Sequence, residues 1–213
     1  MTGRPPPAAE RAKRRRPGRP KGGQVVADRE QLLTAAMRVI DAHGPEVTLE
    51  DIAAGASVSK PILYRTIGDK DALIAALSET LVDRINASVA AATAAAPDPA
   101  AGFEAAIRAS LHTIQADKHL FLFVNGGAGS ESFRRLVDRS ALDMIELFGA
   151  SRARAGLDPT PARTWAYAVV GAIQVVATMW VRDEFADLDD VGRDLARLIW
   201  SGLAQVGDTP AET

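Results

Sequence analysis

The amino-acid sequence predicts an all-α protein. Alanine is abundant, apolar residues recur at helical spacing, and no segment shows the alternation expected of a strand. The chain has 213 residues and 47% hydrophobic content, which is enough to bury a core in one large domain or two small ones. It contains no cysteine, which excludes a disulfide framework and a thiolate metal site. We therefore expect an all-helical, cytoplasmic protein.

The segment 1–27 is strongly basic and is expected to be disordered on its own. It carries eight basic residues and one acidic residue, it is rich in Pro and Gly, and it has few large apolar side chains. A secretion signal is excluded, because charges at 28–30 interrupt any apolar run that follows. A DNA-grasping arm is favoured over a solubilising tail or a membrane-surface patch.

Part of this segment is similar to a known DNA-binding motif. Gly18-Arg19-Pro20 resembles the core of the AT-hook, in which Arg lies in the narrow minor groove of A·T-rich DNA. The match is partial, because Pro17 stands where a further Arg is expected. The expected DNA contacts of the arm are Arg16, Arg19 and Lys21.

The next segment, 28–75, predicts three short helices and the start of a fourth. A first amphipathic helix runs from Asp28 to about His43. Thr48 caps a second helix, with Asp51 three residues later at the spacing of a capping box. Ser59 is expected to cap a third helix, and Asp69 a fourth.

The third helix has the composition of a recognition helix. Leu63 and Ile67 are four residues apart and point inward, and Pro61 sits in the first turn, where its missing N–H costs little. A helix that presents Lys, Tyr and Arg outward suits the major groove of DNA. The expected DNA-contacting residues of this region are Thr48, Ser59, Lys60, Pro61, Ile62, Tyr64, Arg65, Thr66 and Lys70.

The ordered motif across these helices resembles the TetR (tetracycline-repressor) family of bacterial regulators. It consists of Thr48, Ile52-Ala53, Val58-Ser59, Leu63-Tyr64 and Lys70-Asp71-Ala72-Leu73. The resemblance covers about residues 28–75. Two positions depart from the family pattern: Ser57 replaces the usual turn glycine, and Ile67 replaces an aromatic residue. Both departures affect the angle between the helices, and neither removes an expected DNA contact.

The charge of this region is unfavourable for DNA binding. Residues 28–75 contain five Lys or Arg and eight Asp or Glu, which leaves the predicted DNA-binding domain acidic. Lys60, Arg65 and Lys70 cluster locally, but additional attraction is needed. We expect the basic arm to supply much of the affinity and the helix-turn-helix to set the register.

The remaining chain, 76–207, is expected to be a helical ligand-binding and dimerisation domain, followed by a tail at 208–213. The predicted helices run from Asp69 to about Ala95, from Ala100 to about Asp117, from Ser130 or Ser132 to about Ala155, from Thr160 onward, and from Leu188 to Val206. The glycine-rich stretch at 125–129 lacks the Lys-Ser/Thr and the preceding strand of a phosphate-binding loop, and is interpreted as a connection.

The segment Thr164 to Val181 contains 18 residues without a charge, a length that can span a bilayer. Its Tyr, Gln, Thr and small residues favour a helix buried on both sides instead. In the family that the sequence resembles, the last two helices pair with their copies in a second subunit. The resemblance therefore implies a homodimer that binds two half-sites about 34 Å apart on double-stranded DNA, and no membrane partner.

The resemblance also implies a small-molecule effector that shifts the protein away from its DNA-binding state. The aromatic and Met content favours a hydrophobic ligand, and buried amides seek hydrogen-bond partners. The candidate ligand-binding residues are Phe103, Ile107, Leu111, Phe121, Asn125, Met144, Phe148, Trp165, Val169, Gln174 and Trp180.

No catalytic residue, metal site or cofactor is expected. The sequence shows no HExxH, nucleophile elbow or paired-carboxylate motif, and the histidines at 43, 112 and 119 are interpreted as solvated surface residues. Three interpretations remain open: a ligand-released repressor of a palindromic operator, a constitutive DNA-architectural protein without an inducer, and an all-α enzyme. The repressor is preferred, because repression is the usual mode of the family.

Overall fold

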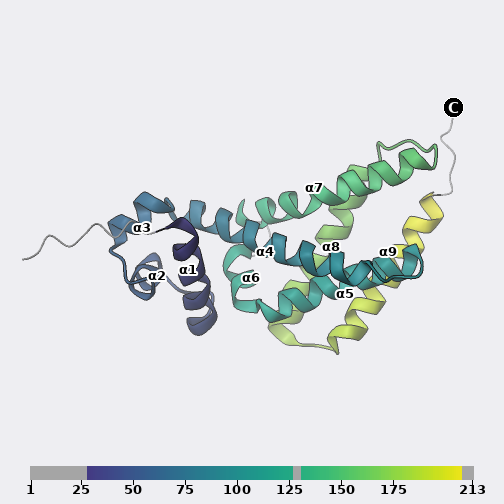
Figure 1. Cartoon of the computed structure of the whole chain (residues 1–213). Coiled ribbons are helices and arrows are strands. Elements are labelled where there is room, and N and C mark those ends of the chain that lie inside the picture. The colour runs from purple at the N-terminus through teal and green to yellow at the C-terminus, as the bar shows by residue number, and fades with distance from the viewer. Residues whose placement is uncertain (1–27, 127–130, 208–213) are drawn as a thin grey trace, which may run out of the picture.

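A computed structural model describes residues 28–126 and 131–207, and these residues form nine α-helices (Figure 1). The helices are α1 (Arg29–His43), α2 (Leu49–Gly55), α3 (Lys60–Thr66), α4 (Lys70–Thr93), α5 (Pro99–Ala116), α6 (Lys118–Asn125), α7 (Glu131–Arg154), α8 (Ala162–Asp183) and α9 (Leu188–Gly207). The prediction of an all-α fold is confirmed. The arm at 1–27, with Arg16, Arg19 and Lys21, and the tail at 208–213 lie outside the described residues.

A small unit of α1, α2 and α3 occupies one end of an elongated molecule (Figure 1). Its core is made by one apolar face from each helix, with Ile40, Ile52 and Leu63 almost fully buried. The expected capping box of α2 is present. The Thr48 hydroxyl accepts from the Asp51 N–H at 3.2 Å, and the Asp51 carboxylate accepts from the Thr48 N–H at 2.8 Å.

Some helix boundaries differ from the sequence expectation. Ser59 occupies the N-cap position of α3, but its side chain makes no capping hydrogen bond, so the expected side-chain cap is wrong. α4 ends at Thr93 rather than near Ala95. Pro99 begins α5, because the Asp98 carboxylate accepts from the Ala101 N–H at 2.9 Å and thereby fixes the start one residue early.

The larger part of the molecule is a helical body built around the long helix α4. This helix starts at the small unit, runs the length of the body and packs along α5 (Figure 1). α7 packs on α8, and α5 packs on α9. The short helix α6 lies between the unit and the body, where it contacts α1, α4 and α7.

Among the described helices, α8 is long and apolar enough to cross a membrane by length and composition, and half of that stretch is buried inside the protein. Ala166, Val169 and Ala177 on one side belong to the core. Val175 and Met179 on the other side are 50% and 42% exposed. α8 is thus a core helix that also presents an open apolar face.

Candidate functional site

The turn between α2 and α3 fixes the angle of the outward helix. Ser57 has φ of 56°, the left-handed conformation that favours glycine. The turn is closed by two backbone hydrogen bonds, in which Ser57 N–H donates to Ala54 O and Val58 N–H donates to Ala53 O, both at 3.0 Å. The departure at Ser57 that the sequence showed is therefore accommodated with a strained residue rather than with a different turn.

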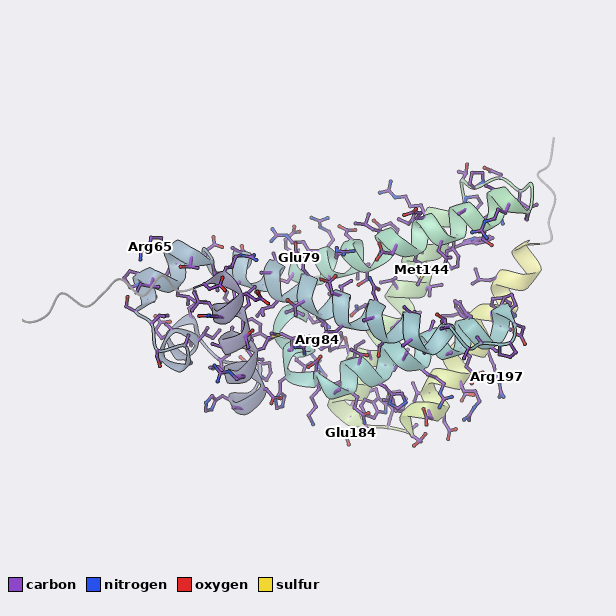
Figure 2. All side chains as sticks on the ribbon, in the orientation of Figure 1. Arg65, Glu79, Arg84, Met144, Glu184 and Arg197 are labelled. Carbon is purple, nitrogen blue, oxygen red and sulfur yellow. The ribbon has the colours of Figure 1, made fainter. Side chains whose placement is uncertain are left out.

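The α3 helix presents its polar residues away from the core. Leu63 and Ile67 are buried as predicted, whereas Pro61, Tyr64 and Arg65 are exposed. Arg65 lies at the end of the molecule farthest from α9 (Figure 2). The predicted α3 contacts thus share one accessible surface on a helix short enough to enter a groove, made of Lys60, Pro61, Ile62, Tyr64, Arg65 and Thr66.

Lys60, the first residue of α3, already has an anionic partner inside the protein. Its ammonium group forms an exposed ion pair with the Glu50 carboxylate of α2 and lies 5.8 Å from the centre of the Tyr64 ring. The hydrogen bond between the two charged groups lowers the pKa of Glu50 and raises the pKa of Lys60. The sequence analysis did not single out Glu50, because the two residues are ten positions apart on different helices and no periodicity links them.

Two other predicted DNA contacts also have partners. Thr48 is exposed, and its hydroxyl donates to the Asp51 carboxylate at 2.7 Å, a hydrogen bond that lowers the pKa of Asp51. The Lys70 ammonium lies 5.9 Å from the centre of the Phe123 ring of α6. Contact of these residues with DNA remains a prediction, and each also holds the unit together or ties it to the body.

One polar contact from α6 ties the unit to the body, and two others hold parts of the body together. The Arg84 guanidinium of α4 donates to both carboxylate oxygens of Asp117 at 2.8 and 2.9 Å (Arg84 is labelled in Figure 2). His119 Nδ1 lies 2.9 Å from the Asp41 carbonyl at the end of α1, an acceptor that requires Nδ1 to carry a proton. Within the body, His112 Nε2 lies 2.7 Å from Asp189, and the His112 side chain is 49% exposed, so this histidine is a surface residue that also has a partner inside the protein.

A cavity of about 540 Å³ lies in the body, between α4, α5, α7, α8 and the Trp200 ring of α9. Its volume lies within the range of small-molecule sites, roughly 300–1,000 Å³. Six of the eleven predicted ligand-binding residues line it: Phe103, Ile107, Met144, Phe148, Val169 and Gln174. Their contact with a ligand remains a prediction.

The other five predicted residues do not line this cavity, and their contact with a ligand also remains a prediction. Leu111 and Phe121 are filled core positions, at 1% and 0% exposure. The Asn125 amide donates to Thr178 at 2.9 Å, and the Trp180 indole donates to the Ala186 carbonyl at 2.8 Å. Trp165 packs against Arg152, whose guanidinium carbon lies 4.5 Å from the centre of the Trp165 ring. Each therefore meets its packing or hydrogen-bonding needs within the protein.

The α4 and α9 walls of the cavity were not predicted from the sequence. Val82, Ile85 and Val89 line it from α4, and the Trp200 ring lies 5.6 Å from that of Phe103 across it. The spacing of the three α4 residues, i, i+3 and i+7, is typical of an inward stripe. It gave no sign that the stripe faces an unfilled space rather than packed core. Among the described residues, no group of three or more His, Cys, Asp or Glu is placed to hold a metal ion.

Comparison with known proteins supports a regulator. Residues 32–77 match the family model described as bacterial regulatory proteins, tetR family. An uncharacterised HTH-type transcriptional regulator of Mycobacterium tuberculosis is 28% identical over 85% of this chain and 79% of its own. The HTH-type transcriptional activator FasR of Mycolicibacterium smegmatis is 27% identical over 93% and 94%. A TetR-like transcriptional regulator from Rhodococcus sp. RHA1 superimposes with a TM-score of 0.60 at 29% identity, over 83% of this chain and 96% of the other.

A helix-turn-helix with an exposed polar α3, carried on an all-helical body, defines a DNA-binding transcriptional regulator. The order of the helices, the family match at 32–77 and the similarity of the whole chain to known regulators agree on the group. The chain belongs to the TetR family of bacterial regulators.

Proposed function

We propose that the protein is a dimeric repressor that leaves a palindromic operator when a small hydrophobic molecule occupies the cavity. The observation that carries this proposal is the position of α4. The same helix begins beside the helix-turn-helix, with the Asp69 carboxylate accepting from the Ala72 N–H at 2.9 Å, and lines the cavity farther along at Val82, Ile85 and Val89. A ligand that displaces this wall acts directly on the helix that supports the DNA-binding unit.

Dimerisation through the last two helices is supported by their exposed apolar side chains. Val175 and Met179 lie one turn apart on α8, and Leu198 on α9 is 75% exposed. Contiguous apolar surface of this kind marks an interface in soluble proteins. A two-fold pairing of these helices presents two copies of α3 to successive turns of one face of DNA.

The proposed function is tested by footprinting the purified full-length protein on DNA that flanks its own gene. We expect two protected half-sites separated by about one helical turn, 10–10.5 base pairs, or a multiple of it. An apolar compound that binds the cavity should release this DNA. Binding to any A·T-rich DNA without a ligand response would instead establish an architectural protein, and turnover without DNA affinity an enzyme.

The direction of regulation needs a separate measurement, because the relative FasR is named an activator. A reporter gene placed behind the footprinted site should rise in expression when the regulator is deleted. A fall in expression would establish activation and overturn the repressor assignment, while leaving the DNA-binding and ligand steps in place.

We also propose that the basic arm at 1–27 contributes most of the electrostatic attraction to DNA. The described DNA-binding unit is net acidic, and its Lys60 is paired with Glu50. If four to six arm charges meet phosphates, each steepens the dependence of log affinity on log salt by about 0.9. Deleting residues 1–22 should flatten this slope, and an unchanged slope would refute the role of the arm.

A further inference from the structure

One buried polar side chain in the cavity wall has an amide oxygen without a hydrogen-bond partner among the described residues. Gln174 of α8 is 3% exposed and lines the cavity, and its amide oxygen Oε1 makes no hydrogen bond to any described group. Buried amides are almost always paired, because an unpaired one loses its hydration without compensation. An unpaired amide beside a cavity of ligand size indicates that the partner comes from outside the chain.

The local hydrogen bonds hold Gln174 in place while leaving its amide unused. The backbone carbonyl of Gln174 accepts from the Thr178 hydroxyl at 2.7 Å, and Thr178 in turn accepts from the Asn125 amide at 2.9 Å. This stretch of α8 is thereby tied to the end of α6, which contacts the DNA-binding unit. These bonds fix the backbone that carries Gln174, and none of them uses its side-chain amide.

The charges around the cavity select further among ligands. Among the described residues that line the cavity there is no Lys, Arg or His. The ionisable residue among these lining residues is Asp143. Asp143 is largely exposed, accepts from the Asn86 amide at 2.7 Å and has Arg139 at 3.7 Å. A ligand carboxylate or phosphate placed inside would lose its hydration and gain no described cation in the wall, which strongly disfavours binding.

The hydroxyl groups of the wall do not change this selection. Ser110 donates to the Ala106 carbonyl at 2.8 Å, and Thr93 to the Val89 carbonyl at 2.9 Å. Each hydroxyl hydrogen is therefore already donated to a backbone carbonyl of the same helix. Ser140 and Ser151 of α7 also line the cavity, where they are less buried than Gln174. Most of the remaining wall is aliphatic and aromatic, with Phe103, Met144 and Phe148 from facing helices, and it matches a hydrocarbon body.

We propose that the effector is an uncharged molecule with a hydrocarbon body and a single hydrogen-bonding end group, of which a hydroxyl is the best match, held by Gln174. This inference rests on the proposed role of the cavity as the effector site. A hydroxyl both donates and accepts, so it pairs with the Gln174 amide whether the oxygen or the nitrogen faces it. The cavity selects against the ionised carboxylate of the same chain length.

The test compares 1-decanol with decanoate at about pH 8, where decanoate is ionised. Binding to the purified full-length protein without DNA is followed by tryptophan fluorescence, since Trp200 lines the cavity, and by thermal shift. We expect decanol to bind at least about tenfold more tightly than decanoate, because the buried charge is unpaired.

The variant Gln174→Met keeps the length of the side chain and removes its hydrogen bonding. It should reduce decanol affinity about threefold to tenfold, as expected for the loss of one neutral hydrogen bond. It should melt at a temperature no lower than the unaltered protein, because no internal hydrogen bond of the amide side chain is lost. Gln115→Met, the same change at an exposed position of α5, is the matched control and should leave both values unchanged.

The proposal is overturned if decanoate binds as tightly as decanol, if neither binds, or if Gln174→Met leaves the decanol affinity unaltered, which would assign the amide to ordered water. The proposed function is measured separately, by release of the footprinted DNA. Decanol that binds through Gln174 and leaves the DNA complex intact would support the ligand class and contradict the ligand-released repressor.

Discussion

In the DNA-binding unit the candidate functional side chains point outward, whereas in the helical body they point into a cavity. In the unit, the central core side chains Ile40, Ile52 and Leu63 are at 1% exposure or less, and the polar residues point outward from α3. In the body, the walls of five helices leave about 540 Å³ unfilled, and the functional candidates point inward. The unit therefore depends on tight packing to hold a surface in place, whereas the body depends on incomplete packing to hold a space open.

The first test of this comparison is to make a cavity among the buried side chains of the unit. Leu63→Ala in α3 should destabilise the protein by about 2–5 kcal/mol, the usual cost of a large-to-small change in a filled core, and should abolish specific DNA binding. Leu142→Ala on α7, where the side chain is exposed, should cost less than about 0.5 kcal/mol. Chemical denaturation measures both. Equal costs for the two variants would show that the core of the unit is not tightly packed.

The second test adds a methyl group to each region. A Cβ at Gly55, the last residue of α2, would overlap Cγ2 of Val39 in α1, so Gly55→Ala should cost about 1–3 kcal/mol by overpacking. A Cβ at Gly171 in α8 meets nothing within 4 Å. Gly171→Ala should therefore stabilise the protein by up to about 1 kcal/mol through helix propensity. Thermal denaturation of both variants should give shifts of opposite sign, and a destabilised Gly171→Ala would contradict the open packing of α8.

A third test concerns the cap that starts α2. Thr48→Ala should cost about 1 kcal/mol at neutral pH, because an N-cap residue loses its hydrogen bond. The Thr48 hydroxyl lowers the pKa of Asp51. A carboxylate whose pKa is lowered by folding adds stability above its unfolded pKa and loses it as the pH falls through the folded value. The difference in free energy of unfolding between the unaltered protein and Thr48→Ala should thus become smaller below about pH 3.9, the ordinary pKa of Asp. If this difference does not change with pH, the stabilisation by the Thr48 cap does not depend on the charge of Asp51.

Most of the unit was predictable from the sequence, because its determinants are local. Thr48 with Asp51, Asp69 before α4, and the pair Leu63 and Ile67 all act within one helix turn or one cap. The side-chain cap expected at Ser59 was wrong, since the N-cap position does not oblige the hydroxyl to bond. Local rules place a residue at a helix end, but they do not determine which hydrogen bond its side chain makes.

The cavity was predictable only in part, because it depends on distances between helices that are far apart in the sequence. Apolar periodicity places Phe103, Ile107 and Leu111 on one stripe of α5, yet the first two line the cavity and the third is buried core. The ion pair between Lys60 and Glu50 was missed for the same reason. Periodicity shows which face of a helix is buried and does not show whether that face meets another side chain or an open volume.

The smallest expected effect concerns that ion pair and is measured on DNA rather than on stability. Glu50→Gln frees Lys60 and removes a negative charge beside α3, so it should tighten DNA binding at low salt and steepen the slope of log affinity against log salt by up to about 0.9, the value of one added phosphate contact. Glu146→Gln, the same change at an exposed position of α7, should leave the slope unchanged.

Competition with a scrambled site then separates affinity from specificity. If Glu50 serves as the internal competitor of DNA for Lys60, the variant gains more on the scrambled site than on the operator, because a free ammonium binds any phosphate. Weaker binding of Glu50→Gln to both DNAs would show instead that the carboxylate orients Lys60 for the groove.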